Sequence, residues 1–485
     1  MRAGALTAAR AGLLGGPVAL AFFSGAYFDG PRLAALAGGG LVLALAALGG
    51  GGLPRRGASL GAIAGLTALA AWVGASGAWA PLGDVAGDDF ERVALYAAAL
   101  IAATLAWRAR GAARAAEALA ALGVIVVIAY GLAGRLLPGL VTQRPSASAG
   151  GRLDQPLTYW NATGALAAIG FVLCARIAGD RTRPVALRAG AVAGSVPLAL
   201  GVSLSFSRGA IAALAAGLLV LLVLVRTRAQ LRAAALCVDA GAIAVAAAVL
   251  APGVRILEGS ANARQAQGAA VLAVTLIAMA AGAGLAVVLG RHEQSGRVRM
   301  GHLVLGRRAP LVVTVLVLAL VAVPVLAARG ADGPRTAPGF GATSQRLTSL
   351  GSNRYEYWRV ALDAFAGAPL RGVGSGGFRV AWLRERPIPE AVRDAHSLEL
   401  ETLAELGTIG ALALTLALGG VALAARRAHG ADPVLAAGPI AALATFVLHA
   451  SIDWDWELPA VTLVAISLAG LLLARAARAG PARAR

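Results

Sequence analysis

Long apolar runs separated by short polar segments dominate the chain. A helix that crosses a membrane needs about 20 largely apolar residues, and fourteen runs of suitable length can be marked along the 485 residues. The runs are rich in Ala, Leu, Val and Gly, and small residues allow helices to pack closely in lipid. The pattern predicts an all-α fold, a polytopic membrane bundle of 12–14 helices that forms a single domain over 1–485. The predicted spans lie near 11–28, 33–52, 57–79, 93–107, 118–137, 161–178, 189–207, 209–225, 233–251, 269–290, 310–328, 403–425, 434–450 and 459–474.

The polar segments between the runs predict which way the bundle faces. If the N-terminus is cytoplasmic, 25 of the 43 Arg and only four acids fall on the inner side. Arg-rich short loops are typical of the cytoplasmic side of membrane proteins, so we expect both termini to be cytoplasmic. The first run follows Arg2 and Arg10 but has no clear small-residue cleavage site, and we interpret it as a retained helix rather than a signal peptide.

The composition narrows the possible functions. The chain is 58% hydrophobic and 14% charged, whereas soluble proteins are about 25% charged, which excludes a soluble protein. All 43 basic residues are Arg, and the absence of Lys excludes a Walker-type nucleotide loop, a pyridoxal Schiff base and a Ser/Lys acylase. The net charge of +19 is explained by the inner-side Arg residues, so we expect no nucleic-acid partner.

One polar segment, 329–402, is much longer than the others and falls on the predicted outer side. Loops of this length are usually functional, and we expect two short helices in it, about 353–367 and 394–406, separated by a glycine-rich turn. Gly372, Gly374 and Gly377 match the GxGxxG pattern of dinucleotide sites, but no βαβ unit surrounds them. A tight turn permitted by glycine is the favoured interpretation, and we expect no cofactor.

His396 is the best candidate for acid–base chemistry. It precedes an apolar helix at the outer lip of the bundle, and a His with an ordinary pKa near neutrality can accept a proton from a hydroxyl nucleophile. A helix-starting His that only bonds its own loop is the simpler alternative. His449 and Glu457 flank the acidic and aromatic stretch 453–456 on the same side and are possible secondary site residues.

Arg208 lies between two spans, at their predicted outer ends. A guanidinium at the membrane edge is expensive unless it is paired or contacts an anion, and it can bind phosphate oxygens through two parallel hydrogen bonds. A lipid pyrophosphate headgroup fits this chemistry, while a snorkelling Arg or an ion pair with an acid such as Glu457 is the alternative. Arg354 and Arg359 on the first loop helix are weaker candidates, because exposed helical Arg usually only solvates a face.

Four outer acids could together bind a divalent metal, namely Asp84, Asp88, Asp89 and Glu91. A solvated turn has the same composition, and we favour the turn, so we predict no metal site. The sequence also has no Cys/His zinc spacing, no HExxH and no GxSxG.

Four stretches together resemble the O-antigen ligase/polymerase superfamily of membrane proteins. They are Arg152 to Ala162, Ser207-Arg208-Gly209, the long-loop motifs Arg354-Tyr355…Trp358, Pro369 to Gly374 and Ala395-His396-Ser397…Glu405-Leu406-Gly407, and finally His449…Asp453 to Pro459. The last stretch is similar to actinobacterial members. The resemblance covers about residues 150–460. No single motif identifies the family; the resemblance depends on all four stretches occurring in this order.

The resemblance implies a membrane glycosyltransferase of the C-type class, with 329–402 as its catalytic loop. Such an enzyme would pass a glycan from an undecaprenyl-pyrophosphate donor to an acceptor hydroxyl of a glycan or cell-envelope component, on the outer leaflet of the cell membrane, without metal or nucleotide and with inversion at the sugar carbon. It also implies that His396 is the general base, that Arg208 holds the pyrophosphate, and that Arg354 helps to hold it. Whether the reaction is ligation or polymerisation stays open.

Two other functions stay possible at this point. A transporter or flippase of a polar solute or lipid-linked sugar would place its polar residues near the bilayer midplane, often in repeated halves. Only Asp239 is an acid within a predicted span, and no repeat is visible, so the enzyme is favoured. A metal-dependent transferase using Asp88 and Asp89 is the third hypothesis.

Overall fold

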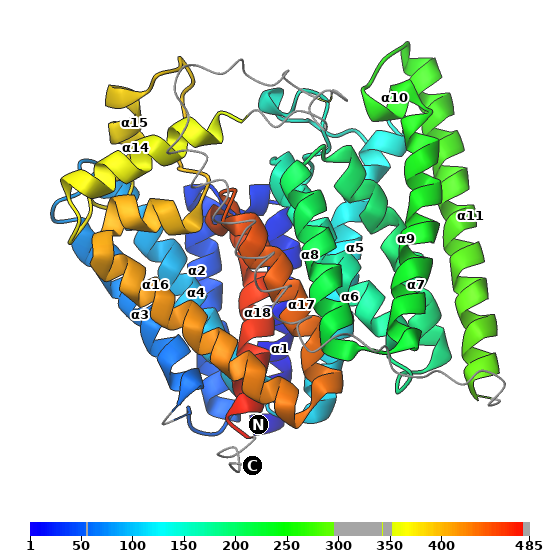
Figure 1. The fold of residues 1–485 in the computed structure, drawn as a ribbon, viewed down its shortest axis with the longest axis horizontal. Coiled ribbons are helices and arrows are strands. Elements are labelled where there is room, and N and C mark those ends of the chain that lie inside the picture. Colours follow the sequence, from blue (N-terminus) through cyan, green and yellow to red (C-terminus); the bar gives the residue numbers. More distant parts are fainter. Residues whose placement is uncertain (55–56, 295–341, 343–351, 479–485) are drawn as a thin grey trace.

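The computed structural model describes residues 1–54, 57–294, 342 and 352–478, and this part of the chain is built from helices without a β-strand (Figure 1). The α-helices are α1 (Arg2–Ala21), α2 (Asp29–Gly49), α3 (Ala58–Ser76), α4 (Gly83–Ala106), α5 (Arg110–Leu136), α6 (Trp160–Gly179), α7 (Val185–Leu204), α8 (Arg208–Val225), α9 (Arg228–Val249), α10 (Pro252–Arg255), α11 (Ala261–Gln294), α14 (Arg354–Gly367), α15 (Gly377–Glu385), α16 (Leu398–Ala431), α17 (Pro433–Ala450) and α18 (Pro459–Ala476). Short 3-10 turns lie at Ser24–Ala26, Ala147–Ala149 and Asp455–Glu457.

The expected all-α membrane bundle is confirmed. Thirteen of the fourteen predicted spans fall on helices of the described residues, and the other, 310–328, lies outside them. Twelve of the described helices are long and apolar enough to cross a membrane. The thirteenth helix, α4, is also long. It is not among the twelve because Asp89, Glu91 and Arg92 fall within any part of it that is long enough to cross a membrane.

The prediction that the acids at 84–91 form a solvated turn is wrong. They lie in the first three turns of α4, which begins at Gly83, and Asp84 lies in the first turn, where the helix dipole favours negative charge. Arg32 of α2 pairs with Asp88 and, at 3.1 Å, with Glu91, so a neighbouring helix compensates the charge of these acids. A solvated turn and an acidic helix start have the same amino-acid composition. Only the pairing with Arg32, which is distant in the sequence, shows that these acids belong to a helix.

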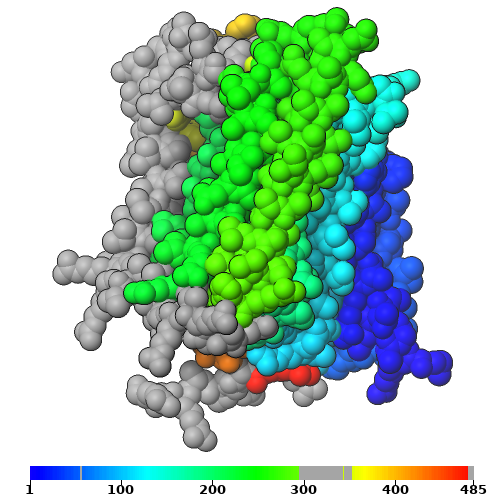
Figure 2. Space-filling model, turned by 90° about the vertical axis from the view of Figure 1, so that its right-hand side faces the viewer, coloured from blue at the N-terminus to red at the C-terminus, as the bar shows by residue number. Residues whose placement is uncertain are grey.

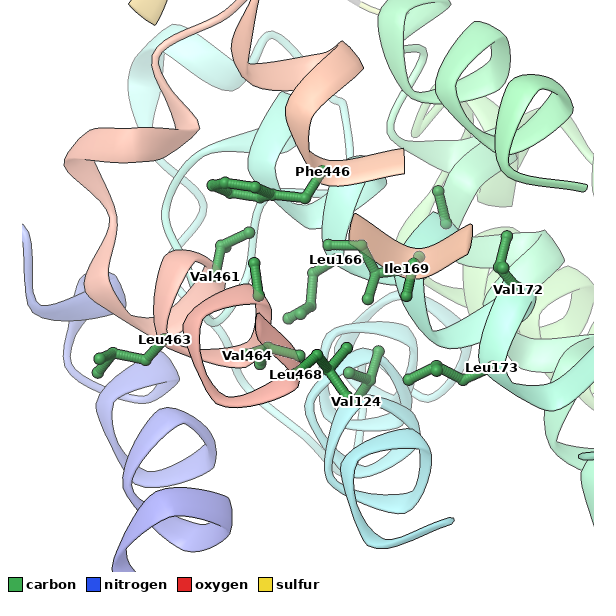
Figure 3. Close-up of a cluster of buried hydrophobic side chains, with 14 of the residues drawn as sticks. Val124, Leu166, Ile169, Val172, Leu173, Phe446, Val461, Leu463, Val464 and Leu468 are labelled. Atoms are coloured by element: carbon green, nitrogen blue, oxygen red, sulfur yellow. The ribbon is translucent and has the colours of Figure 1, made fainter. Parts of the chain in front are cut away.

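The centre of the bundle is formed by α6 and α18, whose residues are almost all buried. Both are apolar all round rather than on one face, as expected of helices surrounded by other helices. Val124 of α5, Leu166 of α6, Phe446 of α17 and Val464 of α18 converge in one cluster (Figure 3). This packing fixes the positions of the helix ends that carry the candidate site.

The outer helices show the opposite pattern. The long helix α11 runs along the surface of the bundle from one end to the other (Figure 2), and large apolar residues such as Ile277 and Leu285 are exposed on it. Exposed apolar side chains on a spanning helix suit contact with lipid. The start of α1 and the end of α18 lie at one end of the bundle, whereas α14 and α15 lie at the opposite end, which we call the loop end (Figure 1).

At the loop end the two helices predicted from the sequence are present, with differences. The first is α14, close to the predicted 353–367. The second starts at Leu398 rather than 394 and continues past the predicted end at 406 into the long α16. Between them the expected glycine turn is followed by α15, a helix that the sequence did not predict.

The helix α16 is broken at Gly407, where φ is 64° and ψ is −163°, a conformation that is essentially restricted to glycine. The glycine turn fills this break. The amide of Val373 donates to the carbonyl of Ala404 at 3.0 Å and that of Gly374 to the carbonyl of Glu405 at 2.8 Å. Past the break, the amide of Thr408 donates to the carbonyl of Pro369 at 2.9 Å. The helix therefore changes direction without leaving these backbone groups unpaired.

Replacing Gly407 by Ala should disrupt the loop end selectively. A Cβ at this position would lie 2.4 Å from the carbonyl oxygen of Leu370 and would require a backbone conformation that L-residues rarely adopt, at a cost of about 1–3 kcal/mol. We expect a lower melting temperature of the purified protein in detergent. Gly419→Ala is the matched control on the same helix, because a Cβ there meets no atom within 4 Å. Equal melting temperatures for the two variants would contradict the role given to the break.

Candidate functional site

The candidate site lies at the loop end, where five segments of the chain meet. They are the start of α14, the loop before α16, the turn between α17 and α18, the start of α8 and the segment before α6. Four of these segments border a membrane helix whose packing determines their position, and the fifth, the start of α14, belongs to a helix that packs against α16.

Asp453, in the turn after α17, is the carboxylate around which the site is built. Its side chain is 1% exposed and forms an ion pair with Arg354, the first residue of α14. The hydroxyl of Tyr159 donates to its Oδ1 at 2.5 Å, and Asn161 donates to that hydroxyl at 2.7 Å. Burial opposes the ionisation of Asp453, but Arg354, His396, His449 and the hydrogen bond from Tyr159 together hold the pKa of this carboxyl below its ordinary value.

His396 is held in one orientation by its own loop. Its backbone lies in the left-handed region, with φ 57°, and its Nδ1 lies 2.9 Å from the carbonyl oxygen of Asp394. A carbonyl can only accept, so Nδ1 carries the hydrogen and Nε2 of the neutral ring keeps its lone pair. Burial lowers the pKa of His396 below its ordinary value, Arg354 adds to this shift, and Asp453 opposes it. His396 is therefore a neutral base at pH 7.

Aromatic side chains surround the His396 ring. Its centroid lies 5.2 Å from that of Tyr357 and 6.3 Å from that of Trp454. Trp454 in turn stacks on Tyr159, with ring centroids 4.1 Å apart. The apolar rings restrict water around the base, while Arg354 and Asp453 supply charge beside it.

Arg208 is the first residue of α8, and Ser207 caps this helix by accepting from the amide of Ala210 at 3.2 Å. The positive charge of Arg354 acts on Arg208 and also on His396. The charge of Arg354 thus links Arg208 and His396, which come from two other stretches of the chain. Adjacent guanidinium groups suit a ligand that carries two or more negative charges.

The three secondary candidates each contact a charged partner. His449 is fully buried and lies between Asp455, which pairs with its Nδ1, and Ser207, whose Oγ is 3.4 Å from its Nε2. Glu457 pairs with Arg92 of α4. Arg359 lies 3.5 Å from Glu356 on its own helix and is 39% exposed. Of these, only His449 connects to the start of α8 beside Arg208.

Sequence inspection missed an acidic cavity beside this site. A cavity of about 110 Å³ is lined by residues that include Tyr27, Arg92, Asp394, Glu401 and Glu457. Burial raises the pKa of Asp394 to about 6 and that of Glu457 to about 8, although Arg92 opposes both shifts. Glu457 was already a candidate from the sequence, whereas Tyr27, Arg92, Asp394 and Glu401 were missed, and only the position of Asp394 two residues before His396 could have indicated one of them.

The carboxylates of Asp394, Glu401 and Glu457 lie within 4.8 Å of one another, a spacing that could hold a cation. The guanidinium of Arg92 already pairs with Glu457 and with Asp89. The acids of the metal hypothesis are also paired with Arg, Asp88 with Arg32 and Asp89 with Arg92.

Comparison with known proteins identifies one related family. Residues 193–415 match the family described as O-antigen ligase. The matched region includes Arg208, Arg354 and His396, and it confirms the resemblance predicted from the sequence for this part of the chain. No curated protein matches the chain.

The Arg354–Asp453 pair should contribute strongly to stability. Arg354→Met leaves a buried carboxylate without its cation, and breaking a buried pair costs roughly 3–5 kcal/mol. We expect the lower end of this range because the Arg354 side chain is 22% exposed. Adding Asp453→Asn should recover part of the loss, as measured by thermal unfolding in detergent. Arg359→Met is the control on the same helix, and a melting temperature as low as that of Arg354→Met would contradict this explanation.

Proposed function

Because residues 193–415 match the O-antigen ligase family, we propose that the protein is a membrane glycosyltransferase that moves a glycan from an undecaprenyl-pyrophosphate donor to an acceptor hydroxyl. The observation that carries this proposal is the meeting of Arg208, Arg354 and His396 at the loop end. Arg208 and Arg354 supply charge for the pyrophosphate, and His396 supplies the base. We assign the loop end to the outer face of the membrane and both termini to the cytoplasm.

The proposed reaction assigns one step to each of these side chains. The acceptor hydroxyl gives its proton to Nε2 of His396 as its oxygen attacks the anomeric carbon of the donor. A new carbon–oxygen bond forms while the bond to the pyrophosphate breaks, and undecaprenyl pyrophosphate departs with the electron pair. Attack opposite the leaving group inverts the configuration at the anomeric carbon.

The charged side chains stabilise both products of this step. Negative charge grows on the leaving pyrophosphate, where fixed guanidinium groups that need no reorganisation are most effective. Positive charge grows on His396, and Asp453, which favours the protonated imidazole, compensates it. Side chains of the protein thus stabilise both the negative and the positive charge that develop in this step. We therefore propose that the reaction is independent of metal.

The acceptor decides between two forms of the reaction. Transfer to the growing end of a second lipid-linked glycan is polymerisation, and transfer to a different cell-envelope component is ligation. Purified protein given a lipid-linked oligosaccharide, with and without candidate acceptors, distinguishes them, because the product either lengthens by repeat units or carries a new acceptor.

Three substitutions test the proposed roles in this assay. His396→Ala and Arg354→Ala should each lower the rate of glycan transfer at least about a hundredfold, the usual effect of losing a general base or a leaving-group cation. Arg359→Ala, five residues further along α14, should change the rate less than about threefold, since Arg359 is paired on its own helix and partly exposed. Unchanged transfer by His396→Ala would refute the general-base role. Monodisperse protein for all three variants excludes misfolding as the cause.

The dependence of transfer on pH should reflect His396. Burial keeps the pKa of His396 below its ordinary value of 6.5, so the base is neutral at pH 7 and activity should fall only as the pH drops below about 6.5. The carboxyl of Asp394, whose pKa is raised to about 6, also titrates in this region. Asp394→Asn should nevertheless keep the acid limb of the profile, and the disappearance of the limb in this variant would assign it to that carboxyl instead.

A further inference from the structure

We infer that the turn 453–455 after α17 sets the spacing between Arg208 and Arg354, and that this spacing selects a diphosphate over a single phosphate. Asp453 holds Arg354 directly, and Asp455 holds the start of α8 through His449. His449 and Asp455 are thereby positioning residues of the donor site. This inference rests on the proposed function, because it explains how the anion-binding part of that site is held.

A chain of buried side chains connects the turn to the start of α8. Asp455 pairs with Nδ1 of His449, and Nε2 of the same ring lies 3.4 Å from Oγ of Ser207. His449 and Asp455 are fully buried, and Ser207 is 3% exposed. Ser207 caps α8 by accepting from the amide of Ala210 at 3.2 Å. The chain of contacts therefore ends at the residue that precedes Arg208.

The same three side chains have the order of an Asp-His-Ser triad, in which the serine attacks a substrate. The hydroxyl of Ser207 is instead used in the helix cap and is enclosed by the protein. A nucleophile must reach the atom that it attacks. We therefore interpret the three side chains as a support for α8.

The ring of His449 also contacts the first turn of α8 directly. A Cβ on Gly209 would lie 3.1 Å from Nε2 and 3.3 Å from Cδ2 of this ring. Glycine at this position therefore lets the ring and the helix backbone touch. Since Gly209 follows Arg208 in the chain and α8 packs along α17 (Figure 1), a shift of the His449 ring would move the residue beside Arg208.

The backbone that leads into α8 needs this support. Phe206 has φ 51°, in the left-handed region, and a residue other than glycine stays there only when its surroundings hold it. The amide of Ser207 donates to Oγ of Ser205 at 3.2 Å, and His449 adds a contact from another helix. The tight turn before Arg208 is thus held by its own segment and by α17.

The turn 453–455 is itself firmly anchored. The hydroxyl of Thr462 in α18 donates to the carbonyl of Asp455 at 3.0 Å, and the hydroxyl of Tyr96 in α4 donates to the carbonyl of Trp456 at 2.6 Å. Helices α4, α17 and α18 together fix one short segment. The two carboxylates of this segment hold the two arginines at a constant separation.

A constant separation matters because the arginines repel each other. The positive charge of Arg354 acts on Arg208, and like charges move apart unless their side chains are held. A diphosphate carries two anionic groups a fixed distance apart, so it binds both guanidinium groups at once only when their spacing matches, and the second contact then strengthens the first. One guanidinium suffices for a single phosphate. The ratio of the two affinities therefore measures the spacing.

The test compares inorganic pyrophosphate with inorganic phosphate, by isothermal titration calorimetry of the full-length protein in nanodiscs. The wild type should bind pyrophosphate at least about tenfold more tightly than phosphate, and Arg208→Ala should reduce this ratio to about threefold or less. Asp455→Leu and Gly209→Ala should each lower the ratio toward that of Arg208→Ala. Their affinity for phosphate should change less than about twofold, because each arginine is still present.

Two further variants separate positioning from other roles. Asp455→Asn can still form a hydrogen bond with Nδ1 of His449, so it should keep most of the ratio. Thr445→Val changes α17 where it faces Gly217 of α8, about two turns from Gly209, and it should leave the ratio unchanged. Gly209→Ala removes no polar group and favours the helix, so it tests the inference even if Asp455→Leu does not fold.

Several results would overturn the inference while leaving the donor site in place. They are equal binding of the two anions by the wild type, a wild-type ratio in folded Asp455→Leu or in Gly209→Ala, and a ratio in Thr445→Val as low as in Gly209→Ala. A ratio as low in Asp455→Asn as in Asp455→Leu would also overturn it, because charge rather than position would then be responsible. Unchanged pyrophosphate binding in Arg208→Ala would instead refute the donor site of the proposed function, and the inference with it.

Discussion

The buried carboxylate of Asp453 joins the long loop to the membrane bundle. It lies in the turn between two spanning helices, accepts from Tyr159 at the start of a third, and pairs with Arg354 at the start of α14. Its charge also acts on His396. A carboxylate with so little exposure is stable only when its partners are in place. The loop, the base and the bundle are therefore ordered together, and a change in one of these partners is felt by the others.

The sequence predicted the parts of this fold that depend on local composition. Apolar runs near 20 residues identify spanning helices because nothing else in lipid satisfies the backbone. His396, Arg208 and Arg354 could be selected because alternation of the spans puts all three on one side. The acids at 84–91 were misjudged because their helical state depends on Arg32 of another helix. The helix α15 and the acidic cavity were missed for a related reason, since both arise from contacts between segments that are distant in the chain.

Charge has two uses in this protein, and they are separated in space. Several Arg residues lie away from the candidate site, at or near the ends of membrane helices, where Arg110, Arg114 and Arg183 pair with acids of other segments. A few lie among aromatic and acidic side chains at the loop end, where each has a defined partner or a charged neighbour. Arg suits this second use because its planar group stays charged when buried. The absence of Lys fits a chain in which every buried cation must hold its charge.

The break in α16 has a consequence for how such proteins can change over generations. The turn around Gly372–Gly374 completes the hydrogen bonds of a helix that begins some thirty residues later, and it does so through backbone atoms, with Gly407 required at the crossing. The turn and the first part of α16 thus form one structural unit, although they are separated in the sequence. Recombination with a breakpoint between them would pair a turn with a helix it was not selected to fit, so the loop is expected to be inherited as a block together with the first part of α16.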